Sequence, residues 1–206
     1  MQYLKHPKPL FSSLLSLILC LSVTIAYAAE PLTKDIRGWA PTKRLIDHGN
    51  KANLQLRMLP SPFRHLGDTM QIQITSPEAG YLFLLDINSA GHLTRIFPNQ
   101  YTEQGPQMKS GFIKAEQTVI IPDSNYGFDF RAIKPIGKGL LVAFLIEEEF
   151  VDGVVLPKEF ESLNRAQTHA TLKQLNHYLN EMLETDESIG RSVHWSITTL
   201  DYKITD

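Results

Sequence analysis

The sequence predicts a mainly β domain: an antiparallel β-sandwich, Ig-like in style, with one long amphipathic helix near its C-terminal end and a last strand after it. Three observations support this fold class. Many short segments alternate apolar and polar side chains, as half-buried strands do. Two segments, 80–87 and 140–146, are apolar at nearly every position, which is typical of central strands covered on both faces. Helical spacing of leucines is confined to about 161–184.

Apolar runs and turn residues give the order of the strands. Alternating runs at 54–58 and 70–75 are separated by a loop with prolines and a glycine. The apolar run 80–87 is followed by the turn 88–91 and a return strand at 92–97, which predicts a hairpin. Further strands are predicted at 118–121, 128–133, 140–146 and 193–204.

The predicted helix carries an apolar stripe. Leu172, Leu175, Leu179 and Leu183 recur every three or four residues. Ser162 is the expected N-cap, and Thr185-Asp186 begin the exit from the helix. A helix before the last strand is unusual in a sandwich and must cover one face or an open end. A mixed α+β sheet is the alternative fold.

The first 28 residues have the layout of a secretory signal peptide. Lys5 and Lys8 precede the apolar run 10–25, and Ala-Tyr-Ala at 26–28 is a small-x-small cleavage site. We therefore expect cleavage between Ala28 and Ala29 and a periplasmic or secreted protein. Residues 29–52 then form a lead-in segment, and 53–206 form a single β-rich domain.

Two alternatives to cleavage stay open. An uncleaved anchor is one, although the apolar run is shorter than the ~20 residues that a membrane-spanning helix needs. Lipidation of Cys20 is the other, although Leu19 stands where a small residue is required. Cys20 is the single cysteine, so the mature chain has no disulfide, thiolate nucleophile or cysteine metal site.

Charge excludes two classes of partner. The leader holds two lysines and no acid, so its removal changes the net charge from −2 to −4. A nucleic-acid binder needs a basic face that releases counterions from phosphates, and a polybasic membrane-surface module needs a similar excess of cations. We expect neither kind of partner, and no membrane span after cleavage.

Motifs for catalysis or metal binding are weak. Asp86-x-Asn88-x-x-Gly91 lacks the later ligands of a calcium loop, and Asp123-x-Asn125-x-Gly127-x-Asp129 lacks a closing Glu. Both are interpreted as turns. The acidic run 147–149 is interpreted as a solvated strand end rather than a hydrolytic acid pair. We expect no metal and no cofactor.

Aromatic loop residues give the strongest surface feature. Phe97, Asn99 and Tyr101 follow a strand, and Tyr126 lies in another loop. Exposed aromatic side chains on rigid loops are typical binding anchors, so these four residues are the predicted binding surface. The alternative for Phe97 is that it plugs the end of the sandwich.

Several stretches together resemble one bacterial family of domains of unknown function. They are Gly67-Asp68-Thr69, the run 80–85, the Gly91 hairpin, the segment 96–99 and the segment 119–122. Domains of that family are often attached to caspase-like peptidases and to bacterial serine/threonine kinases of the eukaryotic type. The resemblance covers about 53–146. It implies a β-sandwich and an accessory or recognition role, and it supplies no catalytic residue.

The leading hypothesis is an exported, non-enzymatic binding or adaptor domain of the bacterial cell envelope. Its partner would be another envelope protein or a small ligand. The alternative is an envelope hydrolase or metal-dependent enzyme that uses Asp123, Asp129 and a histidine brought together by folding. The sequence leaves the ligand and the oligomeric state open.

Overall fold

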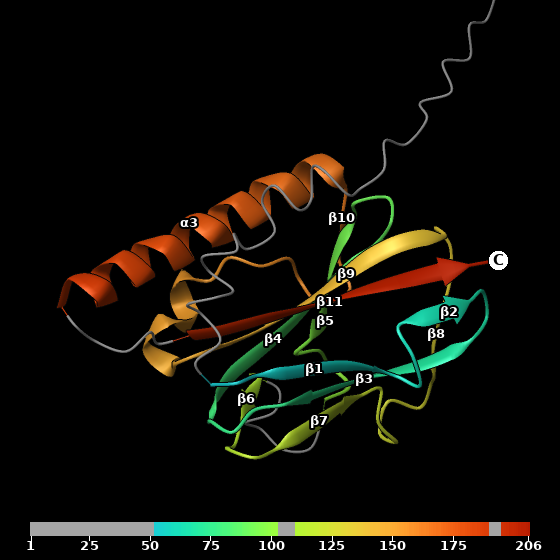
Figure 1. The fold of residues 1–206 in the computed structure, drawn as a ribbon, viewed down its shortest axis with the longest axis horizontal. Helices are drawn as coiled ribbons and strands as arrows, with labels where there is room; N and C mark the ends of the chain where they lie inside the picture. The colour runs from blue at the N-terminus through green and yellow to red at the C-terminus, as the bar shows by residue number, and fades with distance from the viewer. Residues whose placement is uncertain (1–51, 103–109, 190–194) are drawn as a thin grey trace, which may run out of the picture.

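Two β-sheets pack face to face, and a long helix covers the outer face of the larger sheet (Figure 1). The computed structural model describes residues 52–102, 110–189 and 195–206. The leader, its expected cleavage site at Ala28 and Ala29, and most of the lead-in segment lie outside the described residues.

The smaller sheet has the strand order β1 (Gln55–Leu59), β3 (Thr69–Thr75), β7 (Thr118–Ile121), and β8 (Phe130–Arg131) also pairs with β3. The larger sheet has the order β10 (Ser162–Leu163), β5 (Leu93–Phe97), β4 (Gly80–Ile87), β9 (Gly137–Ile146), β11 (Trp195–Thr205), β2 (Phe63–His65), and β6 (Phe112–Ile113) also pairs with β4.

The predicted sandwich, with a helix near its end and a last strand after it, is confirmed. β4 and β11 both pair antiparallel with β9, the latter over ten residue pairs from Trp195–Ile146 to Ile204–Gly137. One pairing departs from the antiparallel prediction, since β2 runs parallel to the end of β11. A parallel pair needs a long connection, and here almost the whole domain lies between the two strands.

The two faces of the larger sheet build two separate cores. On the inner face, Leu82 and Leu84 of β4 and Ala143 of β9 pack against Ile72 and Ile74 of the smaller sheet. On the outer face, the alternate residues of the same strands pack against the helix. Successive side chains of a strand point to opposite faces, so a strand between two cores carries apolar residues on both faces. This explains the two continuous apolar runs of the sequence.

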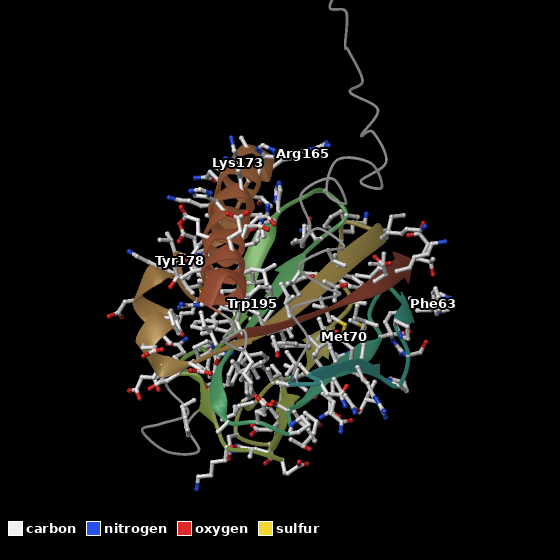
Figure 2. The ribbon with its side chains drawn as sticks, turned by 60° about the vertical axis from the view of Figure 1, so that its left-hand side comes forward. Phe63, Met70, Arg165, Lys173, Tyr178 and Trp195 are labelled. Atoms are coloured by element: carbon white, nitrogen blue, oxygen red, sulfur yellow. The ribbon has the colours of Figure 1, made fainter. Side chains whose placement is uncertain are left out.

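Helix α3 (Arg165–Ile189) covers the outer core with its leucine stripe. Phe83 and Phe144 stack beneath it with ring centroids 4.9 Å apart. Figure 2 shows Tyr178 and Trp195 on this side of the large sheet and Met70 on the side of the smaller sheet. Among the described helices, none combines the length and hydropathy that a membrane crossing requires.

The predicted N-cap is wrong. Ser162 belongs to β10, pairs with Thr94 of β5 and lies three residues before the helix begins at Arg165. Asn164 caps the helix instead, because its Oδ1 accepts hydrogen bonds from the backbone N–H groups of Ala166 at 3.0 Å and Gln167 at 3.1 Å. The Oε1 atom of Gln167 accepts the N–H of Asn164 at 3.0 Å, which completes a capping box. The helix also continues beyond the predicted exit, to Ile189.

Candidate functional site

The loop after β5 is organised by a buried asparagine. Asn99 is only 3% exposed. Its Nδ2 donates to the hydroxyl of Tyr126 at 2.8 Å, and also to the carbonyl of Ile96. Its Oδ1 accepts the backbone N–H of Tyr101 at 2.8 Å. A buried amide with its groups paired fixes the conformation of the loop, so Asn99 holds the two tyrosines in place rather than facing solvent.

Two of the four predicted surface residues are buried aromatics. Phe97 has no accessible surface and packs in the core between the sheets, so its ring is out of reach of a ligand in this conformation. Tyr126 is 4% exposed, and burial raises the pKa of its hydroxyl to about 12, against the opposing effect of the hydrogen bond from Asn99. The phenol is therefore neutral at ordinary pH and serves as a fixed hydrogen-bonding group.

The exposed part of this loop region is a group of aromatic rings, here called the aromatic cluster. Its members are Tyr101, Tyr126, Phe128, Phe130 and Phe160. Tyr101 lies at its centre, with its ring centroid 5.0 Å from Phe128, 5.7 Å from Tyr126 and 5.8 Å from Phe160. Phe130 completes it, 5.9 Å from Phe128. These separations are in the range of favourable edge-to-face and offset contacts. Phe128 is 43% exposed and Phe160 is 38% exposed, whereas Tyr126 and Asn99 are buried. The cluster therefore presents apolar rings to solvent.

Phe160 holds a strained position in the cluster. Its φ of +55° lies in the left-handed region, which a bulky residue rarely adopts. Its N–H donates to the carbonyl of Arg95 at 3.3 Å, and this contact ties the segment before β10 to β5. A bulky residue persists in this region only where the surrounding structure fixes it.

A groove runs beside the cluster and shares one of its rings. Its volume is about 540 Å³. Phe128 belongs to both the groove and the cluster. Asp123 and Asp129 line the groove, so folding brings together the two acids of the Asp123–Asp129 motif. The remaining lining residues are Leu59, Pro60, Thr69, Met70, Gln71, Pro122 and Ser124.

The side chains of Asp123 and Asp129 make different contacts. Oδ1 of Asp123 accepts the backbone N–H of Asn125 at 2.9 Å, which is the turn that the motif predicts. Asp129 lies 3.6 Å from Arg131 across an exposed ion pair. The groove lining contains no histidine, and within the described ranges no three His, Cys, Asp or Glu side chains gather as metal ligands. The arrangement offers charge and apolar surface for binding.

The first calcium-like motif also has a structural use. Oδ1 of Asn88 accepts the backbone N–H groups of Ala90 at 3.0 Å and His92 at 3.1 Å, which forms the hairpin turn. Asp86 instead accepts a hydrogen bond from the hydroxyl of Tyr202 at 2.7 Å. At the acidic run, Glu148 begins the 3-10 helix η1 (Glu148–Gly153) and accepts a hydrogen bond from Tyr81 at 3.0 Å.

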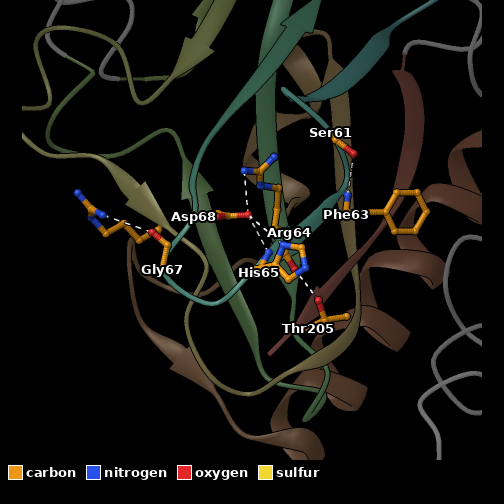
Figure 3. Close-up of polar contacts among 8 residues, drawn as sticks. Ser61, Phe63, Arg64, His65, Gly67, Asp68 and Thr205 are labelled. Atoms are coloured by element: carbon orange, nitrogen blue, oxygen red, sulfur yellow. Dashed lines mark hydrogen bonds and ion pairs between the residues drawn. The ribbon is translucent and has the colours of Figure 1, made fainter.

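The Gly67-Asp68-Thr69 motif forms the turn between β2 and β3 (Figure 3). Oδ2 of Asp68 accepts the backbone N–H of His65 at 2.8 Å and pairs with Arg64 at 3.0 Å. These contacts, with the backbone hydrogen bond first, hold the pKa of Asp68 below its usual value. Gly67 has a φ of +87° and donates its N–H to Ala132, so the motif positions β8 against β3 rather than forming a ligand site.

The architecture and the loop cluster define a two-sheet sandwich domain with an aromatic surface at one end. Residues 65–149 match the model of a family described as "Domain of unknown function (DUF4384)". The matched segment starts at the Asp68 turn and includes Tyr101, Tyr126, Phe128 and Phe130, whereas Phe160, α3 and β11 follow it. Neither the curated proteins nor the solved structures include a significant match to the chain.

The sequence indicates Asn99, Tyr101 and Tyr126 as loop residues but not that they meet. The structure brings the three into contact, and their binding role stays a prediction. The sequence pattern indicates Phe128 and Phe130 only as alternating strand residues. No sequence pattern indicates that Phe160 belongs to the site, because it contacts Tyr101, which lies 59 residues earlier in the chain.

Proposed function

We propose that this protein is an exported, non-enzymatic binding or adaptor domain of the bacterial cell envelope. Its partner, another envelope protein or a small ligand, docks on the aromatic cluster. The observation that carries the proposal is the exposure of Phe128 and Phe160 on a base fixed by Asn99. The secretory layout of the first 28 residues supports the cellular location.

Rigidity is what suits the cluster to binding. Aromatic side chains contribute most of the energy at many interfaces, because they bury a large area with few rotatable bonds. Here the rings contact one another and the loop beneath them is held by hydrogen bonds. Little conformational entropy is then lost when a partner docks.

The proposal predicts that Phe128→Ala weakens partner capture and leaves the fold intact. The chain is immobilised and used to capture proteins from an envelope extract, and the affinity for the captured partner is then measured. We expect a loss of more than about tenfold, as for an interface anchor. Tyr101→Ala is the companion variant, and we expect a similar loss of affinity together with a lower thermal midpoint, because its ring contacts three others.

Phe63→Ala is the matched control, because Phe63 is an exposed phenylalanine of β2 outside the cluster. It should leave capture unchanged. A Phe128→Ala or Tyr101→Ala protein that melts early yet captures its partner normally would show that these rings only pack, and it would overturn the proposed surface.

A further inference from the structure

We infer that the groove beside the aromatic cluster receives a lysine or arginine side chain from an extended segment of the partner. This inference rests on the proposed function, because it assigns a chemical class to what the same end of the domain binds. The groove volume of about 540 Å³ lies within the range of ligand sites, which is about 300–1,000 Å³.

Charge complementarity selects a cation. Of the ten described residues that line the groove, two are carboxylates and none is basic. Arg131 pairs with Asp129 at 3.6 Å while both side chains remain more than half exposed. An exposed pair of this kind contributes little and exchanges readily with another partner. An anionic ligand would meet repulsion from both acids, whereas an ammonium or guanidinium group gains from both.

The apolar lining selects a long side chain rather than a small ion. Leu59, Pro60, Met70 and Pro122 offer hydrocarbon surface in the same groove as the acids. A lysine or arginine can lay its methylene stem on such surface while its charged end stays near the carboxylates. The ring of Phe128 adds an electron-rich face on which a cation can rest. A hydrated metal ion would use neither feature.

The acids are also held for this role. The Asx turn of Asp123 fixes its carboxylate at the end of β7. Asp129 stands between two ring residues, Phe128 and Phe130, which are themselves in contact at 5.9 Å. The two acids and the exposed ring of Phe128 therefore lie on one short segment, 123–129, and line the same groove.

The test uses two blocked pentapeptides of equal length, Ala-Lys-Leu-Lys-Ala and Ala-Glu-Leu-Glu-Ala, titrated into the isotope-labelled chain. Amide chemical shifts report the contact and its affinity. We expect saturable shifts at residues 123–129 with the lysine peptide and none with the glutamate peptide. The dissociation constant should rise about fivefold or more when NaCl is raised from about 50 to about 500 mM, because salt screens exposed charges.

The variants separate charge from fold. Asp123→Asn with Asp129→Asn keeps the Oδ1 acceptor of the turn and removes both charges, and we expect about a fivefold or greater weakening of the lysine peptide. Glu181→Gln on α3, which covers the opposite face of the large sheet, is the matched control and should change nothing. Equal affinity for the two peptides, or a double variant that binds the lysine peptide as tightly as the parent, would overturn the inference.

Failure of the inference and failure of the proposed function give different results. If Phe128→Ala abolishes capture of the envelope partner while the lysine peptide does not bind, the cluster is a binding surface and its ligand is not cationic. If the lysine peptide binds at 123–129 while Phe128→Ala captures normally, the groove has the inferred chemistry and the partner docks elsewhere.

Discussion

At the scale of single residues, the most consequential polar contact lies inside the sandwich. Asp86 of β4 points toward the space between the sheets, where Leu82 and Leu84 of the same strand are buried. Tyr202 of β11 reaches it across β9 and donates a hydrogen bond at 2.7 Å. Burial raises the pKa of Asp86 to about 6, and the hydrogen bond from Tyr202 opposes that rise only in part. The domain therefore carries a carboxyl group that resists ionisation.

Asp86→Asn is predicted to stabilise the protein above pH 6. The folded pKa of about 6 exceeds the ordinary aspartate value of 3.8, so the folded state binds the proton more tightly than the unfolded state. This contribution to stability is present at low pH and is lost as pH rises through about 6. Asparagine keeps the Oδ1 acceptor and carries no charge. We expect its free energy of unfolding to exceed that of the parent by on the order of 2 kcal/mol at pH 8.

Denaturant unfolding of both proteins at pH 5 and pH 8 measures this effect. The difference between variant and parent should grow with pH, which separates Asp86 from groups with the opposite sign such as Asp68. Asp68→Asn is the control, because its contacts lower the pKa of Asp68, so this substitution should not favour the variant increasingly as pH rises. A constant difference at the two pH values would contradict a raised pKa at Asp86.

At the scale of elements, the contact between Tyr202 and Asp86 depends on a glycine in β9. Gly139 pairs directly with Tyr202 in the β9–β11 register, and a Cβ at position 139 would overlap the phenol ring. The ring is buried and hydrogen-bonded, so it cannot swing aside freely. Gly153 is crowded in the same way by Tyr178, whose hydroxyl donates to the carbonyl of Phe150 at 2.9 Å, but that ring is only partly buried.

Gly139→Ala is predicted to destabilise the domain by roughly 1–3 kcal/mol, the usual cost of overpacking a core. The added methyl group must displace Tyr202 and strain or break its hydrogen bond to Asp86. Gly153→Ala should cost less, because Tyr178 can move toward solvent. Chemical denaturation midpoints of the two variants test the contrast. Equal losses, or no loss at Gly139, would show that the Tyr202 ring is not fixed as described.

Elements with local periodicity could be predicted, and elements defined by contact could not. The two continuous apolar runs and the leucine stripe of α3 are readable from the sequence because each repeats its pattern over several residues. β6, β8 and β10 have two residues each, too few for any period, and they exist through pairing with β4, β3 and β5. The N-cap prediction for Ser162 is wrong for this reason. The sequence shows that a serine can cap a helix, but it does not show the strand with which this serine pairs.

The same limit applies to the candidate site. Asn99 and Tyr101 are two positions apart in the sequence, and their turn chemistry indicates a loop. Asp86 was considered as a hairpin-turn residue, but its partner Tyr202 lies 116 positions away. Phe160 joins Tyr101 only after the chain has passed through β9 and η1. A pattern within one segment predicts how that segment is buried, whereas a site assembled from distant segments requires the fold.

At the scale of the whole molecule, both ends of the described domain meet on β11. The backbone N–H of Ala52 donates to Oγ of Ser196 at 2.8 Å, with both residues buried. β2 then adds to the other end of β11 in parallel. The segment that matches the family model stops before α3 and β11. In this chain those two elements complete the larger sheet and its outer core.

The position of Ala52 bears on the last prediction, cleavage between Ala28 and Ala29. Twenty-three residues separate that bond from Ala52, so cleavage removes none of the described packing. We expect mass spectrometry of the exported protein to give an N-terminus at Ala29. Ala28→Leu should block processing, because the signal peptidase requires a small residue there. An intact leader on the parent protein would indicate an anchor, and an acylated N-terminus at Cys20 would indicate a lipoprotein.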